Sequence, residues 1–117
     1  MFTITTNGTI TLTRGDSAEF TVALNIGTTL NQKSIILEPT DKVYFGVTEP
    51  NQPFENAIIR KAFKGADHLN KTELVISIEP KDTCLLIPGM YYYSVKVVNE
   101  NNFVKSVVDK KIFNIID

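Results

Sequence analysis

Cysteine is almost absent from this sequence, because Cys84 is the only one in 117 residues. A single cysteine cannot form an intrachain disulfide, although small secreted domains often depend on such bonds. The first ten residues, MFTITTNGTI, also lack the basic start and the apolar run of a signal peptide. We therefore expect the chain to fold in a reducing compartment, in the cytosol of the cell that makes it.

The sequence also lacks the features of nucleic-acid-binding proteins and of membrane proteins. Twelve basic residues stand against thirteen acidic ones, whereas nucleic-acid-binding proteins usually carry a basic excess. No stretch approaches the roughly 18 apolar residues of a membrane helix. We expect neither a nucleic-acid partner nor a membrane partner. The densest basic segment, RKAFK at Arg60 to Lys64, is interpreted as the solvated face of a strand.

Residues for catalysis or metal binding are equally scarce. His68, the only histidine, lies in the polar segment KGADHLNKT without an evident partner, so a solvated loop histidine is expected. Cys84 lies in an apolar turn and is expected to be a buried, unreactive side chain. The sequence has no zinc-ligand cluster, calcium-loop spacing or glycine-rich phosphate loop. We expect a non-enzymatic chain with no catalytic, cofactor-binding or metal-binding residues.

What the sequence does have is strong alternation of apolar and polar residues, which predicts β-strands. Its length suits one domain, and 43% apolar residues are enough for a sandwich interior. The prediction is a single all-β domain over residues 1–117, an immunoglobulin-like antiparallel β-sandwich of seven to eight strands. The residues expected to face its core are Phe20, Val22, Leu24, Val43, Phe45, Val47, Leu74, Ile76, Ile78, Tyr91, Tyr93, Val95 and Val97.

Three segments carry local strand signals. In FTITTNGTITLT, Asn7-Gly8 is expected to supply the two positive-φ residues of a tight hairpin turn. The segment NAIIRKAF has no cleanly apolar face, which predicts an edge strand. The last segment, NFVKSVVDKKIFNIID, is expected to form a hairpin partner through a turn at Asn99 to Asn102. A bulge near Asp109 would then turn Phe113 and Ile115 inward.

The tetrapeptide Arg14-Gly15-Asp16-Ser17 lies between two predicted strands, where the chain must turn. Gly15 permits a positive φ, and Asp16 or Ser17 can accept hydrogen bonds from the backbone amides just beyond. Animal integrins recognise the same tetrapeptide, so an adhesive role is the alternative. The structural interpretation is preferred because it needs no partner.

A second structural feature is predicted after the strand ELVISIE. The segments ILEPTD and SIEPKD are expected to form the same turn, with a proline and an aspartate that accepts backbone N–H groups. Asp82 is then expected to cap a helical turn over Thr83 to Leu86, with Leu85 or Leu86 covering the core and Pro88-Gly89 ending the turn. The phenol of Tyr91 is expected to reach back to a loop carbonyl, as in a tyrosine corner. Asp82, Gly89 and Tyr91 form this predicted structural corner.

Three segments in order, ITLTRGDSAEF, LEPTDKVYFGV and EPKDTCLLIPGMYYYSV, resemble a pattern of small phage-encoded β-sandwich proteins and of the N-terminal domain of siphophage upper baseplate proteins. The chain departs from the pattern at Ser94-Val95 and at Asp109-Lys110. In such proteins the Arg-Gly-Asp turn is architectural.

The resemblance implies a structural or accessory component of a phage tail or baseplate, or of a prophage-derived particle, that acts by protein–protein docking. Its partners would be other phage structural proteins, in a homo-oligomer or another symmetric assembly. It would be a virion protein, assembled in the cytoplasm of the bacterial host.

A carbohydrate-binding or adhesive surface module is the alternative function. A sugar platform needs several exposed rings, and the sequence places Tyr44 and Tyr92 outside, with Phe54 and Phe103 as further candidates. The loops at 25–34 and 50–56 are the segments with most freedom to carry function. An enzyme that uses His68 is a third, weaker hypothesis.

Overall fold

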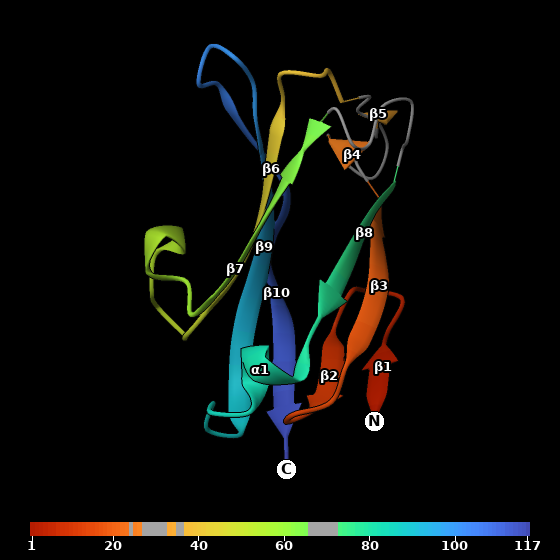
Figure 1. Ribbon diagram of the computed structural model, residues 1–117, viewed down its shortest axis with the longest axis vertical. Helices are drawn as coiled ribbons and strands as arrows, with labels where there is room; N and C mark the ends of the chain where they lie inside the picture. Colours follow the sequence, from red (N-terminus) through yellow and green to blue (C-terminus); the bar gives the residue numbers. More distant parts are fainter. Residues whose placement is uncertain (24, 27–32, 35–36, 66–72) are drawn as a thin grey trace.

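The computed structural model describes residues 1–23, 25–26, 33–34, 37–65 and 73–117 (Figure 1). Within these residues the chain is mostly β-structure, and no helix is long and apolar enough to cross a membrane. The strands are β1 (Phe2–Ile4), β2 (Ile10–Thr13), β3 (Ala18–Ala23), β4 (Asn25–Ile26), β5 (Lys33–Ser34), β6 (Lys42–Thr48), β7 (Ile59–Lys64), β8 (Glu73–Ile78), β9 (Gly89–Val98) and β10 (Val104–Ile116). The short helices are η1 (Phe54–Asn56) and α1 (Pro80–Thr83).

The strands form two packed layers, which confirms the predicted all-β sandwich. One layer is a six-stranded sheet in the order β1-β2-β10-β9-β6-β7, and the β3-β8 pair faces it (Figure 1). β4 and β5 form a further short pair. The described residues contain ten strands, more than the seven or eight expected, because the two-residue segments β4 and β5 also pair. The immunoglobulin-like topology stays a prediction.

One pairing contradicts the expectation of an antiparallel sandwich. β2 runs parallel to β10, with Ile10 beside Phe113 and Leu12 beside Ile115. The chain leaves the six-stranded sheet after β2, crosses to β3 in the other layer, and only its last strand returns beside β2. Alternation of apolar residues predicts which side chains point inward, but it does not determine which strands become neighbours.

The core lies between the two layers and consists of the alternating apolar residues of facing strands. Rings from both layers meet there: Phe20 of β3 lies 6.0 Å from Phe45 of β6, and Tyr93 of β9 lies 6.2 Å from Phe113 of β10, between ring centroids. Every residue predicted to face the core is buried, apart from Leu24, which lies outside the described residues.

The first hairpin is wider than predicted. β1 and β2 pair from Phe2 opposite Leu12 to Ile4 opposite Ile10, so five residues connect them. Only Gly8 of the expected pair has a positive φ, of 89°. Asn7 instead bonds Thr5 through its side chain, and the backbone amide of Gly8 donates to the Thr5 carbonyl at 3.0 Å. The prediction of two positive-φ residues is therefore wrong, because a turn followed by one left-handed glycine closes the loop.

The second hairpin agrees with the prediction. β9 and β10 are antiparallel, and their turn closes where the Asn99 amide donates to the Phe103 carbonyl at 3.1 Å. Asn102 has a φ of 61°, in the left-handed region that asparagine tolerates. β7 is also an edge strand of the six-stranded sheet within the described residues, as predicted.

The predicted bulge in β10 lies where expected and corrects the position of one side chain. The register shifts between Val108 and Lys111, and Lys110 has a φ of 51°. Beyond the bulge Phe113 and Ile115 are buried. Ser94 of β9 lies between Tyr93 and Val95, the residues predicted to face the core, yet it is itself only 8% exposed. Its hydroxyl oxygen accepts a hydrogen bond from the displaced Lys110 amide at 3.1 Å.

Candidate functional site

The Arg14–Ser17 turn lies at the end of the sandwich that also holds α1 and both chain ends (Figure 1). Gly15 has a φ of 82°, in the region that favours glycine. Its amide donates to the hydroxyl oxygen of buried Thr83 in α1 at 2.9 Å, and the Arg14 amide donates to the Ile116 carbonyl at 2.7 Å. The turn therefore connects β2, α1 and the end of β10.

The charged side chains of this turn are also engaged. The guanidinium of Arg14 pairs with the Asp117 carboxylate at 2.9 Å and donates to the Leu86 carbonyl at 3.4 Å. The Asp16 carboxylate lies 2.6 Å from the amino group of Met1, rather than over the amides just beyond the turn. Ser17 is exposed. These contacts favour a structural role for the turn over an adhesive one.

The predicted corner has a different helix from the one expected. α1 spans Pro80–Thr83 rather than Thr83 to Leu86, because proline is favoured at the first position of a helix. Asp82 is thus the third helical residue, and its carboxylate accepts from the Glu79 amide at 2.8 Å. Asp41 accepts from the Glu38 amide at the same 2.8 Å, so the two similar segments do form the same turn.

Burial at this corner also departs from expectation. Cys84 is exposed rather than buried, because it follows the last residue of α1 on the solvent side. Leu86 packs against the core, whereas Leu85 is 92% exposed. Both residues follow α1, in a turn where the Leu86 amide donates to the Thr83 carbonyl at 2.9 Å.

Tyr91 reaches back across the corner as a tyrosine corner requires. Its hydroxyl donates to the Ile87 carbonyl at 2.5 Å, while its ring is 8% exposed. Gly89 begins β9 in open space, so a side chain would meet no neighbour there. The Tyr91 bond ties the Ile87 backbone to the start of β9.

Replacing Tyr91 by phenylalanine is expected to lower the free energy of unfolding by about 1–2 kcal/mol, because the Ile87 carbonyl loses its donor. Urea denaturation of wild type and variant measures the difference. Tyr92→Phe is the matched control, since Tyr92 alternates to the outer face, and it is expected to change little. Equal stability of Tyr91→Phe and wild type would mean that the corner bond contributes nothing.

An ion pair links the corner to the opposite sheet. The Lys61 ammonium of β7 lies 2.7 Å from the Asp82 carboxylate, and both side chains are mostly buried. Burial raises the pKa of Asp82, but hydrogen bonds from Lys61 and the Glu79 amide, with the charges of Lys61 and Lys81, outweigh it and hold the pKa below its usual value. The ionised carboxylate is therefore favoured in the folded protein.

This lowered pKa predicts a pH dependence. The folded protein binds the Asp82 proton less tightly than the unfolded chain, so this stabilisation is complete above the unfolded pKa of about 3.9 and is lost as pH falls through the folded pKa. Asp82→Asn is expected to be about 1 kcal/mol less stable than wild type at pH 7. The difference should narrow below about pH 4. Urea titrations from pH 7 to pH 3 measure it, and a difference independent of pH would contradict the assignment.

An exposed apolar surface projects from the same end of the molecule. Leu85 is 92% exposed, Ile87 78% and Met90 47%. We call these three residues the apolar corner. Large apolar side chains grouped on a surface mark sites where proteins associate, so this surface is a candidate docking site.

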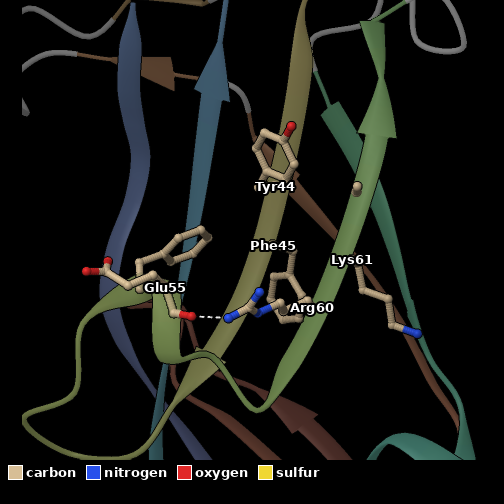
Figure 2. Close-up of a pocket in the computed structure, with 7 residues that line it drawn as sticks. Tyr44, Phe45, Glu55, Arg60 and Lys61 are labelled. Atoms are coloured by element: carbon tan, nitrogen blue, oxygen red, sulfur yellow. Dashed lines mark hydrogen bonds between the residues drawn. The ribbon is translucent and has the colours of Figure 1, made fainter. Parts of the chain in front are cut away.

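A second candidate surface lies on the outer face of the six-stranded sheet, along β6 and β7. One hollow of ≈ 290 Å³ is lined by residues that include Tyr44, Phe54, Glu55, Arg60 and Ala62. A second hollow of ≈ 270 Å³ shares Tyr44 and Ala62 and extends to Lys42 and Lys64. We call the two together the trough. In Figure 2, Tyr44, Glu55 and Arg60 surround the first hollow, and Lys61 points away from it.

Local sequence explains the shape of the trough. Small residues leave space on the sheet, because Ala62 lies directly opposite Tyr44, and Gly46 lies opposite Arg60. The ring of Phe54 in η1 folds over Gly46, where a Cβ atom would lie 2.7 Å from the ring. The Arg60 guanidinium donates to the Glu55 carbonyl (Figure 2) and to the Ala57 carbonyl, which holds the η1 loop against the sheet.

Sequence reasoning assigned RKAFK to a solvated strand face and so missed this surface. The alternation of side chains along the strand could have assigned its charged residues to two faces. Arg60 and Lys64 lie on the outer face, while Lys61 turns inward to Asp82. The predicted functional loop at 50–56 does contribute, through Phe54 and Glu55. His68, and most of the loop at 25–34, lie outside the described residues.

Comparison with known proteins adds no relative to this picture. Among the described residues, no group of three or more histidine, cysteine, aspartate or glutamate side chains could hold a metal ion. No family model, curated protein or solved structure matches the chain.

Proposed function

We propose that this chain is a non-enzymatic structural or accessory component of a phage tail or baseplate, or of a prophage-derived particle, and that it acts by docking to other proteins. The observation that carries the proposal is the apolar corner, where Leu85, Ile87 and Met90 project into solvent. The ordered resemblance of three sequence segments to phage β-sandwich proteins supports the kind of assembly proposed.

The apolar corner is suited to docking because its backbone is held in place. The Tyr91 hydroxyl bonds the Ile87 carbonyl, and the Gly15 amide bonds Thr83 on the other side of the corner. A surface fixed before binding loses less conformational entropy on association. Burying each large apolar side chain contributes roughly 1.5–3 kcal/mol, so three of them can anchor an interface.

A symmetric assembly is the arrangement in which such a surface recurs. Each copy of the chain would present the same corner to its neighbour or to a shared ring of partner subunits. Other phage structural proteins are therefore the proposed partners, and the virion, assembled in the host cytoplasm, is the proposed location.

Quantitative mass spectrometry of particles purified from an induced culture of the source strain tests the proposal. A fixed ratio of this chain to the major tail or capsid protein is the expected result. Absence from the particles, with the chain present in the cell pellet, would refute the structural role.

A double variant, Leu85→Glu with Ile87→Glu, tests the surface itself. It is expected to fold, because both side chains are exposed, and to lose incorporation into particles. Lys81→Glu on neighbouring α1 is the control that introduces charge without removing apolar surface, and it should be incorporated normally. Normal incorporation of the double variant would place the docking surface elsewhere.

The adhesive alternative draws less support from the geometry. Arg14 and Asp16 of the tetrapeptide are paired within the chain, and the Gly15 amide is bonded to Thr83. An integrin adhesion assay with wild type and Asp16→Glu tests it, and a glycan array tests sugar binding. Adhesion that is lost in Asp16→Glu would restore this alternative.

A further inference from the structure

The trough combines an apolar floor with a rim of positive charge. Tyr44 and Ala62 form the shared floor, and Phe54 closes one end. Its cations come from all three neighbouring strands: Lys42 of β6, Arg60 and Lys64 of β7, and Lys96 of β9, whose ammonium lies 5.3 Å from the centre of the Phe54 ring. Among the described residues that line the two hollows, Glu55 is the only carboxylate.

One pairing in the trough is unfavourable for the isolated protein. Lys42 and Lys64 lie directly opposite each other on adjacent antiparallel strands, and both are exposed. Like charges in this position destabilise a sheet. An anionic group bound between the two ammonium groups would convert the repulsion into two attractions. The two paired lysines are therefore a place where a bound anion would remove a repulsion.

The chemistry of the lining indicates what kind of anion fits. The first hollow presents rings and methyl groups, and the Arg60 guanidinium there is already committed to the carbonyls of Glu55 and Ala57. A sugar needs several free polar groups to bond its hydroxyls, whereas an apolar side chain needs only the rings. The Lys96 ammonium lies over the Phe54 ring and donates to the Ser106 hydroxyl. Lys42 and Lys64, which form no ion pair within the described part of the chain, lie at the other end, where carboxylates would meet them.

We infer that the trough binds an extended acidic segment of a partner protein. One aliphatic or aromatic side chain of the segment is seated between Phe54 and Tyr44, and flanking carboxylates lie over Lys42 and Lys64. The trough runs along β7 from Arg60 to Lys64. This is roughly 13 Å of strand, the length of about five extended residues. This surface is separate from the apolar corner, so the inference goes beyond the proposed function and does not depend on it.

The test is a nuclear magnetic resonance titration of the ¹⁵N-labelled chain with the blocked pentapeptide Asp-Glu-Leu-Asp-Glu. The expected result is a set of saturable amide shifts confined to β6, β7 and η1, with an affinity that falls at least several-fold when salt rises from about 20 to about 300 mM. The peptide Asp-Glu-Gly-Asp-Glu, which lacks the anchor, should bind several-fold more weakly. Lys-Lys-Leu-Lys-Lys should cause no shifts in the trough.

Lys64→Glu separates a binding role from a structural one. The new carboxylate lies opposite Lys42, so the melting temperature is expected to stay the same or rise while peptide affinity falls at least tenfold. Lys81→Glu makes the same charge change on α1, away from the trough, and should bind as wild type does. Gly46→Ala is expected to displace the Phe54 ring and reduce the advantage of leucine over glycine in the peptide.

Several results would overturn the inference. These are the absence of shifts at about 5 mM peptide, shifts centred away from the trough, and undiminished binding by a folded Lys64→Glu. If Lys64→Glu does not fold, Lys64→Gln, which only removes the charge, takes its place with the same criterion. Tighter binding of an acidic oligosaccharide, oligogalacturonate, to the same residues would replace the peptide with a sugar and would also refute the inference.

Discussion

Replacing Gly65 by alanine is expected to destabilise the protein by about 3 kcal/mol, although the change adds a single methyl group. Gly65 is buried at the end of β7, where its amide donates to the Asp41 carbonyl at 2.7 Å. A Cβ atom at this position would lie 2.0 Å from the carbonyl oxygen of Glu38 and 3.0 Å from that of Asp41. Both obstructing atoms belong to the backbone, so no side-chain rotation relieves the clash.

Gly89→Ala is the matched control for this prediction. A Cβ atom there would have no neighbour within 4 Å, so the variant should differ from wild type by less than about 0.5 kcal/mol. Thermal and urea unfolding of the three proteins measures the effect. If Gly65→Ala proves as stable as Gly89→Ala, the Glu38–Asp41 turn does not pack against the end of β7 as described.

Replacing Phe113 by alanine is expected to cost about 3–5 kcal/mol. The side chain is fully buried, and its strand is bonded on one side to β2 and on the other to β9. Its ring packs edge-on against Tyr93. Removal of the ring leaves a cavity in the core between the two layers, and the hydrogen-bonded strands on both sides of β10 limit how far its backbone can move to fill it.

Phe103→Ala makes the same chemical change at the turn before β10, where the ring is 59% exposed. Its effect should stay within about 0.5 kcal/mol. Urea unfolding curves for both variants give the comparison. Similar losses from the two substitutions would show that Phe113 is not at the centre of the core.

The apolar corner and the trough are the two proposed binding surfaces of the chain, and their positions suit contact with two different neighbours. The apolar corner and the trough lie on different parts of the sandwich, one beside α1 and the other along β6 and β7. A subunit with two distinct surfaces can contact two different neighbours, which suits a component of a larger assembly. The two tests are independent, because peptide binding is measured on the isolated chain and incorporation on particles.

Much of the fold was predictable from the sequence, because each strand carries its own alternation. Val43, Phe45 and Val47 face inward, since side chains on a strand alternate between its two sides. The turns at Asp41 and Asp82 were predictable for the same local reason, because each aspartate bonds an amide only three residues away. The bulge near Asp109 showed itself as a break in the alternation of a single strand.

The tertiary structure decided the features that depend on segments far apart in the chain. The parallel pairing of β2 with β10 and the Lys61–Asp82 ion pair both follow from how distant segments meet, and no local pattern encodes them. The trough is of this kind, because Tyr44 becomes part of its floor only when Ala62 lies opposite and η1 folds back over Gly46. Periodicity determines which side chains of a strand are buried. Packing between distant segments determines which other side chains lie beside the exposed ones.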